Sequence, residues 1–214
     1  MAERPAPVAA PRKPVVIRDA RYLATATDHT GLPAPEFPEI AFAGRSNVGK
    51  SSLINCLVER RKLVRTSNTP GQTRGISTFR LDLTSAAGEK TSIDLVDLPG
   101  YGFAKRSKSE RKSWGPMIEG FLEQRHGLCG VVLIVDARRG FEDDDTQLLD
   151  YLAHIDLPVV LVATKIDKLT KSERHPRLAA LAASGFAPIA ASSETREGRE
   201  AILARVLDLA GVAR

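Results

Sequence analysis

The sequence predicts an α/β protein with a doubly wound, mostly parallel sheet and helices on both faces of that sheet, giving three layers. Two observations predict this fold class. Short apolar runs, typical of buried strands, alternate with longer stretches that place their apolar residues on one helical face. Polar segments, some containing glycine, follow several of these runs, as loops do at the carboxyl ends of parallel strands. The expected strands are residues 40–43, 76–83, 94–97, 131–135, 158–163 and 187–190, and the expected helices are residues 52–58, 143–155, 178–184 and 197–209.

The 214 residues have the length of one medium-sized domain, which we place at residues 15–214. Residues 1–14 carry several prolines among alanines and basic side chains, a composition that predicts a disordered arm. The longest apolar run, residues 131–135, is far shorter than the roughly 20 residues that cross a bilayer, so no membrane attachment is expected. Two isolated cysteines, Cys56 and Cys129, favour the reducing environment of the cytoplasm.

The segment from Gly44 to Ser51 matches the phosphate-binding pattern G-x-x-x-x-G-K-[ST] and stands between an expected strand and an expected helix. Its glycines let successive backbone N–H groups point at phosphate oxygens, and the helix that follows adds the positive end of its dipole. Lys50 is expected to contact the β and γ phosphates, and the Ser51 hydroxyl to bind Mg²⁺. The residues predicted to surround the phosphates are Gly44, Arg45, Ser46, Asn47, Val48, Gly49, Lys50, Ser51 and Ser52.

The base is indicated by Thr164, Lys165, Ile166 and Asp167, which match the guanine motif [NT]-K-x-D after the strand at 158–163. The Asp167 carboxylate can accept hydrogen bonds from guanine N1–H and the exocyclic amine, whereas adenine offers no such pair of donors. The Lys165 stem is expected to lie along the base. A later loop with Ser192, Ser193 and Glu194 resembles the segment whose backbone N–H contacts guanine O6.

Two further segments resemble the switches of GTP-hydrolysing proteins. Asp97, Leu98, Pro99 and Gly100 follow an apolar strand and form a D-x-x-G element, in which Asp97 is expected to hold Mg²⁺ through a water and Gly100 N–H to contact the γ phosphate. The loop before the strand at 76–83 contributes the candidates Gly71, Gln72, Thr73, Arg74 and Gly75. Thr73 takes the position of the second Mg²⁺-binding hydroxyl, and Thr69 is the competing candidate.

Tyr101 occupies the position at which Ras-like enzymes carry the glutamine that orients the attacking water, so slow intrinsic hydrolysis is expected. The residues predicted to act in catalysis are Asn47, Lys50, Thr73 and Gly100. Asn47 resembles the asparagine with which some GTPases place K⁺ near the phosphates. The alternative is a polar residue that stabilises the loop.

Residues 38–55 resemble the bacterial EngB group of GTP-binding proteins, also called YihA or YsxC, within the TrmE-Era-EngA-EngB-Septin-like class. Residues 69–73, 97–104, 164–167 and 192–195, together with Trp114, carry the same resemblance. The resemblance implies a P-loop GTPase domain with Mg²⁺ that acts in assembly of the large (50S) ribosomal subunit. It also implies a need for the protein in normal cell division and septation.

Charge adds a hypothesis about the partner, because the net charge is +5 and basic residues cluster beside both switches. These clusters either form a solvated basic face or contact phosphates of ribosomal RNA in a manner controlled by the nucleotide. We expect a monomer that binds GTP, GDP and the large subunit through its RNA or a ribosomal protein. A signalling switch with a protein effector is the alternative function, and a nucleotide kinase is disfavoured by the guanine-specifying elements. The clusters are Lys105, Arg106, Lys108, Arg111 and Lys112 after the second switch (the D-x-x-G segment), and Arg60, Arg61, Lys62 and Arg65 before the first switch (the loop at 71–75).

Overall fold

A computed structural model describes residues 15–60, 62–64, 75–85, 87–102 and 117–212. These residues form a seven-stranded sheet with the strand order β1-β3-β4-β2-β5-β6-β7. The arm expected at residues 1–14 lies outside the described ranges. The strands are β1 (Val16–Ala26), β2 (Glu39–Gly44), β3 (Ile76–Thr84), β4 (Lys90–Asp97), β5 (Leu128–Asp136), β6 (Val159–Thr164) and β7 (Ile189–Ala190), and the α-helices with printed bounds are α1 (Lys50–Leu57), α3 (Asp143–His154), α4 (Lys171–Ala182) and α5 (Arg199–Leu209).

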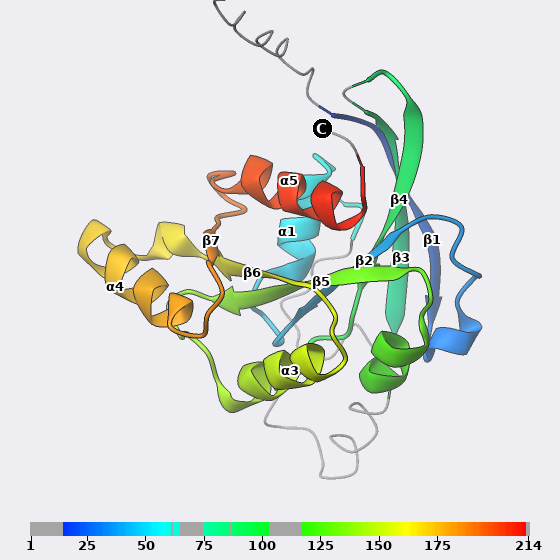
Figure 1. Cartoon of the computed structure of the whole chain (residues 1–214). Helices are drawn as coiled ribbons and strands as arrows, with labels where there is room; N and C mark the ends of the chain where they lie inside the picture. The colour runs from blue at the N-terminus through cyan, green and yellow to red at the C-terminus, as the bar shows by residue number, and fades with distance from the viewer. Residues whose placement is uncertain (1–14, 61, 65–74, 86, 103–116, 213–214) are drawn as a thin grey trace, which may run out of the picture.

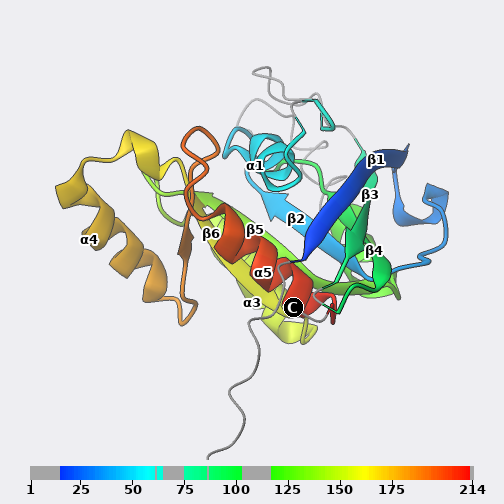
Figure 2. The same cartoon turned by 90° about the horizontal axis from the view of Figure 1, so that it is seen from above.

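The sheet is mostly parallel, as predicted. Strands β4, β2, β5, β6 and β7 run parallel to their neighbours in that order, while β3 is antiparallel to β4 and β1 is antiparallel to β3. Helices α1 and α5 cover one face, and α3 together with the helical residues 117–124 covers the other (Figure 1). Figure 2 shows the same sheet from above, with α5 lying across β5 and β6. The three-layer, doubly wound fold class is therefore confirmed.

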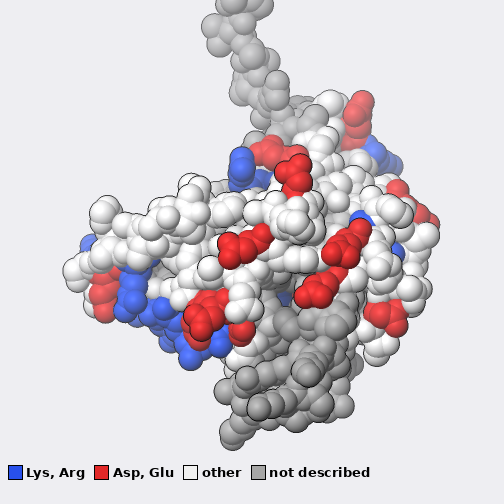
Figure 3. All heavy atoms as spheres, turned by 60° about the horizontal axis from the view of Figure 1, so that its bottom comes forward, with Lys and Arg blue, Asp and Glu red and all other residues white. Residues whose placement is uncertain are grey.

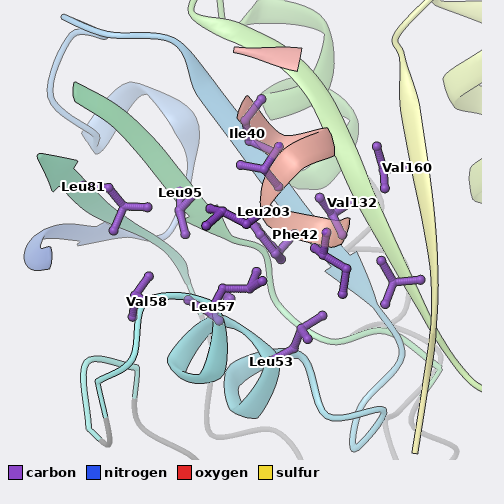
Figure 4. Close-up of a cluster of buried hydrophobic side chains, with 14 of the residues drawn as sticks. Ile40, Phe42, Leu53, Leu57, Val58, Leu81, Leu95, Val132, Val160 and Leu203 are labelled. Carbon is purple, nitrogen blue, oxygen red and sulfur yellow. The ribbon is translucent and has the colours of Figure 1, made fainter. Parts of the chain in front are cut away.

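Strand β2 stands in the middle of the sheet and is buried along its whole length. Successive side chains of a strand point to opposite faces, so Ile40 and Phe42 belong to one core and Ala41 and Ala43 to the other. The first core includes apolar side chains of α1 and α5, and Figure 4 shows Leu53 and Leu57 of α1 and Leu203 of α5 beside Phe42. This central strand delivers Gly44, and with it the phosphate-loop segment, to the middle of one sheet edge.

Strand β1 was not predicted. It pairs with β3 at the outer edge of the sheet, its register shifts twice, and Val16 and Tyr22 are 40% and 55% exposed. An edge strand of this kind shows neither a continuous apolar run nor a strict alternation of apolar and polar residues. The periodicity that identifies buried strands is therefore missing from its sequence.

Helix α4 begins earlier than predicted, at Lys171 rather than at residue 178. Pro176 lies inside the helix, and a proline within a helical pattern is normally read as a boundary. The start is fixed instead by a capping box, in which the Thr170 N–H donates to Glu173 Oε2 at 2.8 Å and the Thr170 side chain caps the N3 backbone.

None of the helices in the described ranges is both long and apolar enough to span a membrane.

Candidate functional site

The segment predicted to bind phosphate turns sharply between β2 and α1. Asn47 and Gly49 have φ angles of 67° and 100°, in the left-handed region that curls the backbone. A Cβ added at Gly44 would lie 2.7 Å from the carbonyl oxygen of Ile134, so only glycine fits the close packing of β2 against β5. Helix α1 then begins at Lys50, with Ser51 and Ser52 in its first turn. The local geometry is that of a phosphate cradle.

Lys50 and Asp97 form a buried ion pair between the Lys50 Nζ and the Asp97 Oδ1. Their side chains are only 7% and 1% exposed. Asp97 ends β4, and β4 pairs with β2 so that Phe42 and Asp97 are partners in register. Sheet pairing thus brings the lysine of the phosphate loop and the acid of the D-x-x-G element together, although 47 positions separate them in the sequence.

The D-x-x-G segment lies directly on the phosphate loop. The Ser46 N–H donates to the Tyr101 carbonyl at 2.8 Å, and the Ser46 hydroxyl donates to the Gly100 carbonyl at 3.1 Å. A Cβ at Gly100 would lie 3.0 Å from Ser46 Cα, so the glycine allows this approach. Leu98 and Pro99, which lie between Asp97 and Gly100, are buried. The two segments that the sequence assigned to phosphate are therefore in contact.

Tyr101 is buried and its hydroxyl donates to Asp145 Oδ1 at 2.8 Å, at the N-terminus of α3. Burial and the Asp145 carboxylate raise the pKa of Tyr101 well above its usual value. Its phenol is thus committed to α3 rather than free to orient a water, which agrees with the loss of the glutamine function inferred for this position.

The guanine motif is joined to the phosphate loop at the carboxyl end of β6. The Thr164 hydroxyl donates to the Val48 carbonyl at 2.7 Å, and the Lys165 ammonium donates to the Asn47 carbonyl. A Cβ at Gly49 would lie 3.8 Å from Lys165 Cε, so the lysine stem passes over the loop. These contacts fix the base-binding segment relative to the phosphate-binding segment.

Asp136 at the end of β5 belongs to this site and was missed by the sequence reasoning. Its Oδ2 lies 3.1 Å from Lys165 Nζ, and both of its oxygens accept from the Arg138 guanidinium, at 2.9 and 2.6 Å. Burial opposes ionisation, yet the hydrogen bonds from Arg138 and Lys165 lower the pKa of Asp136 below its ordinary value. The signal available in the sequence was an acidic residue directly after the expected buried strand at 131–135.

Asp167 and the loop after β7 meet through Ser192, which is 1% exposed. A hydrogen bond from the Ser192 side chain lowers the pKa of Asp167, and Lys168 Nζ, 3.0 Å from Asp167 Oδ2, adds to the effect. The Ser192 Oγ also accepts from the N–H groups of Glu194 and Thr195, each at 3.2 Å. One hydroxyl therefore orders the predicted base loop, including Ser193, and holds it to the predicted base-reading carboxylate.

Several predicted residues lie outside the described part of the chain. They are Gly71, Gln72, Thr73 and Arg74, the competing Thr69, Trp114, and all five basic residues of the cluster at 105–112. Gly75 is described. A Cβ there would lie 2.5 Å from the Ala26 carbonyl, so this glycine permits the close approach of β1 at the start of β3. Across the described residues, no group of three or more His, Cys, Asp or Glu side chains could hold a metal ion.

Comparison with known proteins agrees with this geometry. Residues 39–165 match the family model described as "50S ribosome-binding GTPase". The probable GTP-binding protein EngB of Myxococcus xanthus is 51% identical over 167 residues, covering 78% of this chain and 81% of that protein. Its counterpart in Syntrophotalea carbinolica is 46% identical over 198 residues, covering 91% of each.

Solved structures show the same relationship. A crystal structure of a probable EngB superposes with a TM-score of 0.63 at 26% identity, covering 81% of this chain and 98% of that one. The Era protein of Aquifex aeolicus, solved with GDP and AlF₄⁻, has a TM-score of 0.65 at 22% identity, covers 82% of this chain and 57% of its own, and shows the shared fold alone. Motifs, fold and relatives agree, and the chain belongs to the EngB family of GTP-binding proteins and is a GTPase.

Proposed function

We propose that this GTPase is a nucleotide-controlled switch in assembly of the large (50S) ribosomal subunit, with residues 15–214 as its GTPase unit. The main support for the nucleotide site is that three segments converge at the carboxyl ends of β2, β4 and β6. Ser46 contacts the D-x-x-G segment, and Thr164 and Lys165 contact the phosphate loop. A crevice at the carboxyl ends of parallel strands is where open α/β sheets bind nucleotides.

In this proposal the phosphates lie in the cradle of residues 44–52, with Lys50 against the β and γ phosphates. When the nucleotide binds, Lys50 would leave its ion pair with Asp97 and contact the phosphates, because this buried pair lies at the proposed nucleotide site. The base lies against the Lys165 stem with Asp167 on its donor edge, and the Ser192–Glu194 segment offers backbone N–H groups to guanine O6. Residues 71–75 are proposed to contact the γ phosphate.

The residues also suit Mg²⁺. Asp97 is a buried carboxylate beside the first turn of α1, which contains Ser51, and oxygen ligands of this kind are those that Mg²⁺ prefers. Ser51, Thr73 and, through a water, Asp97 would hold the ion, which supplies positive charge to the phosphate oxygens. K⁺ is the second proposed cation, beside Asn47. The φ of 67° at Asn47 suits asparagine for its backbone alone, so the loop-stabilising role remains the alternative.

Slow intrinsic hydrolysis follows from the burial of Tyr101 against Asp145. Because the Tyr101 hydroxyl is bonded to Asp145, the groups proposed to stabilise the transferring phosphoryl group are Lys50, Asn47, Thr73 and the Gly100 N–H. Acceleration would then come from a bound monovalent cation or from a partner. This behaviour suits a protein that must stay in its GTP state until it reaches the correct particle.

The ribosomal role is supported by the name of the family model, whose members are described as 50S ribosome-binding GTPases. We propose a cytoplasmic monomer that docks on ribosomal RNA or protein and whose loss impairs division and septation. Figure 3 shows the largest group of Lys and Arg on the α4 side of the described surface, with Asp and Glu beside it and over the rest of that face.

Cosedimentation tests the proposal. The purified protein should travel with large-subunit particles in the presence of a non-hydrolysable GTP analogue and remain in the supernatant with GDP. A protein that ignores the particles in both nucleotide states, yet binds GTP, would instead favour the signalling switch with a protein effector.

A further inference from the structure

The beginning of the second switch is held by the phosphate loop through its backbone. Tyr101 forms an isolated parallel bridge with Arg45. In this bridge the Tyr101 N–H donates to the Gly44 carbonyl at 3.3 Å and the Tyr101 carbonyl accepts from Ser46 N–H at 2.8 Å. The contact lies one residue beyond the end of β2 and four residues beyond the end of β4. It leaves Gly100 packed against Ser46.

The Tyr101 side chain makes a second attachment, to α3. Its hydroxyl reaches Asp145 at 2.8 Å, and the two residues are 5% and 1% exposed. Burial and the neighbouring carboxylate raise the pKa of Tyr101, so the phenol stays protonated and remains a donor. A hydrogen bond from a neutral donor to an ionised acceptor in a dry site is of the stronger kind.

Asp145 is itself fixed by the start of α3. Its second oxygen, Oδ2, accepts from the Glu142 N–H at 3.0 Å as one half of a capping box. Both carboxylate oxygens are therefore occupied, one by the helix and one by the switch. The position of Tyr101 is thereby set by a rigid element, although 44 positions separate it from Asp145.

Arg45 also connects the phosphate loop and the second switch to the start of α3. Its guanidinium is paired with the Glu142 carboxylate, and its Nη2 donates to the Gly102 carbonyl at 3.0 Å. Gly102 has a φ of 75°, and a Cβ there would lie 2.3 Å from Arg45 Nε. Two residues of the phosphate-loop and switch segments, Arg45 and Tyr101, therefore meet the two capping residues of α3.

We propose that Tyr101 and Asp145 form a positioning clamp that holds Gly100 over the phosphate loop before the γ phosphate arrives. The inference rests on the proposed nucleotide site, because Gly100 is assigned there to the γ phosphate. A segment that is already in place loses less conformational freedom on binding, so the clamp lowers the cost of binding GTP. GDP has no γ phosphate and does not use Gly100, so its affinity is independent of the clamp. The Tyr101 phenol therefore helps the protein to discriminate GTP from GDP, instead of orienting the attacking water as a glutamine would.

Tyr101→Phe tests the clamp, because it removes the hydroxyl and keeps the buried ring. The affinities of the full-length protein for GDP and for a non-hydrolysable GTP analogue are measured by titration with fluorescent nucleotides. The analogue should bind about tenfold more weakly, the size of one lost hydrogen bond to a charged acceptor, and GDP should change by less than about twofold. Tyr151→Phe is the matched control. It removes a hydroxyl of the same helix, α3, that donates to Glu123 of the helical residues 117–124 at 2.7 Å rather than to the phosphate loop or the D-x-x-G segment, and it should leave both affinities unchanged.

A double-mutant cycle distinguishes positioning from general stability. In an Asp145→Ala background the change Tyr101→Phe should have no further effect on the ratio of the two affinities, because the acceptor is already absent. Equal weakening of GDP and analogue in Tyr101→Phe, an unchanged ratio, or full additivity with Asp145→Ala would overturn the clamp. Failure of the proposed nucleotide site would appear elsewhere, as a wild-type protein that binds neither nucleotide.

Discussion

The Asp136 carboxylate lies 3.1 Å from the Lys165 ammonium, Oδ2 to Nζ. The two residues stand at the ends of neighbouring parallel strands, since Asp136 of β5 is paired in register with Thr164 of β6. Asp136 is 3% exposed, so its negative charge acts on Lys165 with little screening by water. Lys165 is thus oriented from two sides, by this carboxylate and by the Asn47 carbonyl.

The first prediction follows from this pair. Asp136→Asn keeps the size of the side chain but removes the charge that holds Lys165, so GDP and GTP should both bind about tenfold more weakly. Titration with fluorescent nucleotides measures the loss. Asp150→Asn, an exposed aspartate on α3, is the control and should bind as the wild type does. Unaltered affinity in Asp136→Asn would show that the carbonyl contact alone is sufficient.

The second prediction concerns base choice. Asp167→Asn exchanges an acceptor for a donor beside the base, so the preference should move from guanine toward xanthine nucleotides, whose additional carbonyl needs a donor. Competition between GTP and XTP for the same labelled nucleotide gives the ratio directly. The Asp167 assignment fails if the variant binds GTP as tightly as the wild type and still rejects XTP.

The third prediction concerns Mg²⁺. Ser51→Ala should weaken Mg²⁺-dependent binding of both nucleotides, whereas Thr73→Ala should weaken binding of the GTP analogue and hardly affect GDP, because its loop closes around the γ phosphate. Binding is measured with and without Mg²⁺ for each variant. If Thr69→Ala shows that selectivity and Thr73→Ala does not, the assignment of the switch threonine is wrong.

The fourth prediction concerns the partner. Reversal of Lys105, Arg106 and Lys108 to Glu should abolish cosedimentation with large-subunit particles in the GTP state, because contacts with RNA phosphates release counterions. Nucleotide affinity should be retained, and wild-type binding should fall steeply with salt. Reversal of three exposed basic residues on α4 and α5, Lys171, Arg177 and Arg205, is the charge-matched control. Docking belongs to another surface if the first variant still binds, and to the surface of α4 and α5 if only the control variant fails.

The fifth prediction concerns pH and stability. Burial raises the pKa of Asp145 from 3.8 to about 6, with Asp144 adding to the effect and Tyr101 and Arg45 opposing it. Between pH 4 and pH 6 the folded state therefore keeps a proton that the unfolded state has lost, so this group's contribution to stability falls as pH rises. The total change is about 3 kcal/mol, from 1.36 kcal/mol per pKa unit.

Comparison with Asp145→Asn isolates that contribution, since asparagine does not titrate. Chemical denaturation at a series of pH values should show the free energy of unfolding of the variant gaining on the wild type between pH 4 and pH 6, with a constant difference above about pH 7. A difference that does not vary with pH would mean that Asp145 is ionised throughout this range in the folded protein.

The elements that the sequence identified are contiguous patterns. Residues 44–51 carry their own glycines, lysine and serine, and their meaning depends only on a strand before them and a helix after them. The same holds for residues 97–100 and 164–167, each of which ends a buried strand. Apolar periodicity therefore fixed the central strands, the fold class and the order in which the nucleotide elements occur, because each of these features is encoded within a few neighbouring residues.

Tertiary structure alone decided which of these elements touch and which other residues support them. The pairings of Lys50 with Asp97, Asp136 with Lys165 and Tyr101 with Asp145 join residues far apart in the chain. Sheet register brings the first two pairs together, and the packing of α3 brings the third together. Asp145 is one of three consecutive aspartates in a helical first turn, a pattern that indicates charges complementing the helix dipole. Only the packing of α3 against the second switch shows Asp145 as an acceptor. Strand β1 became visible for the same reason, since an exposed edge strand is defined by its pairing partner rather than by its own pattern.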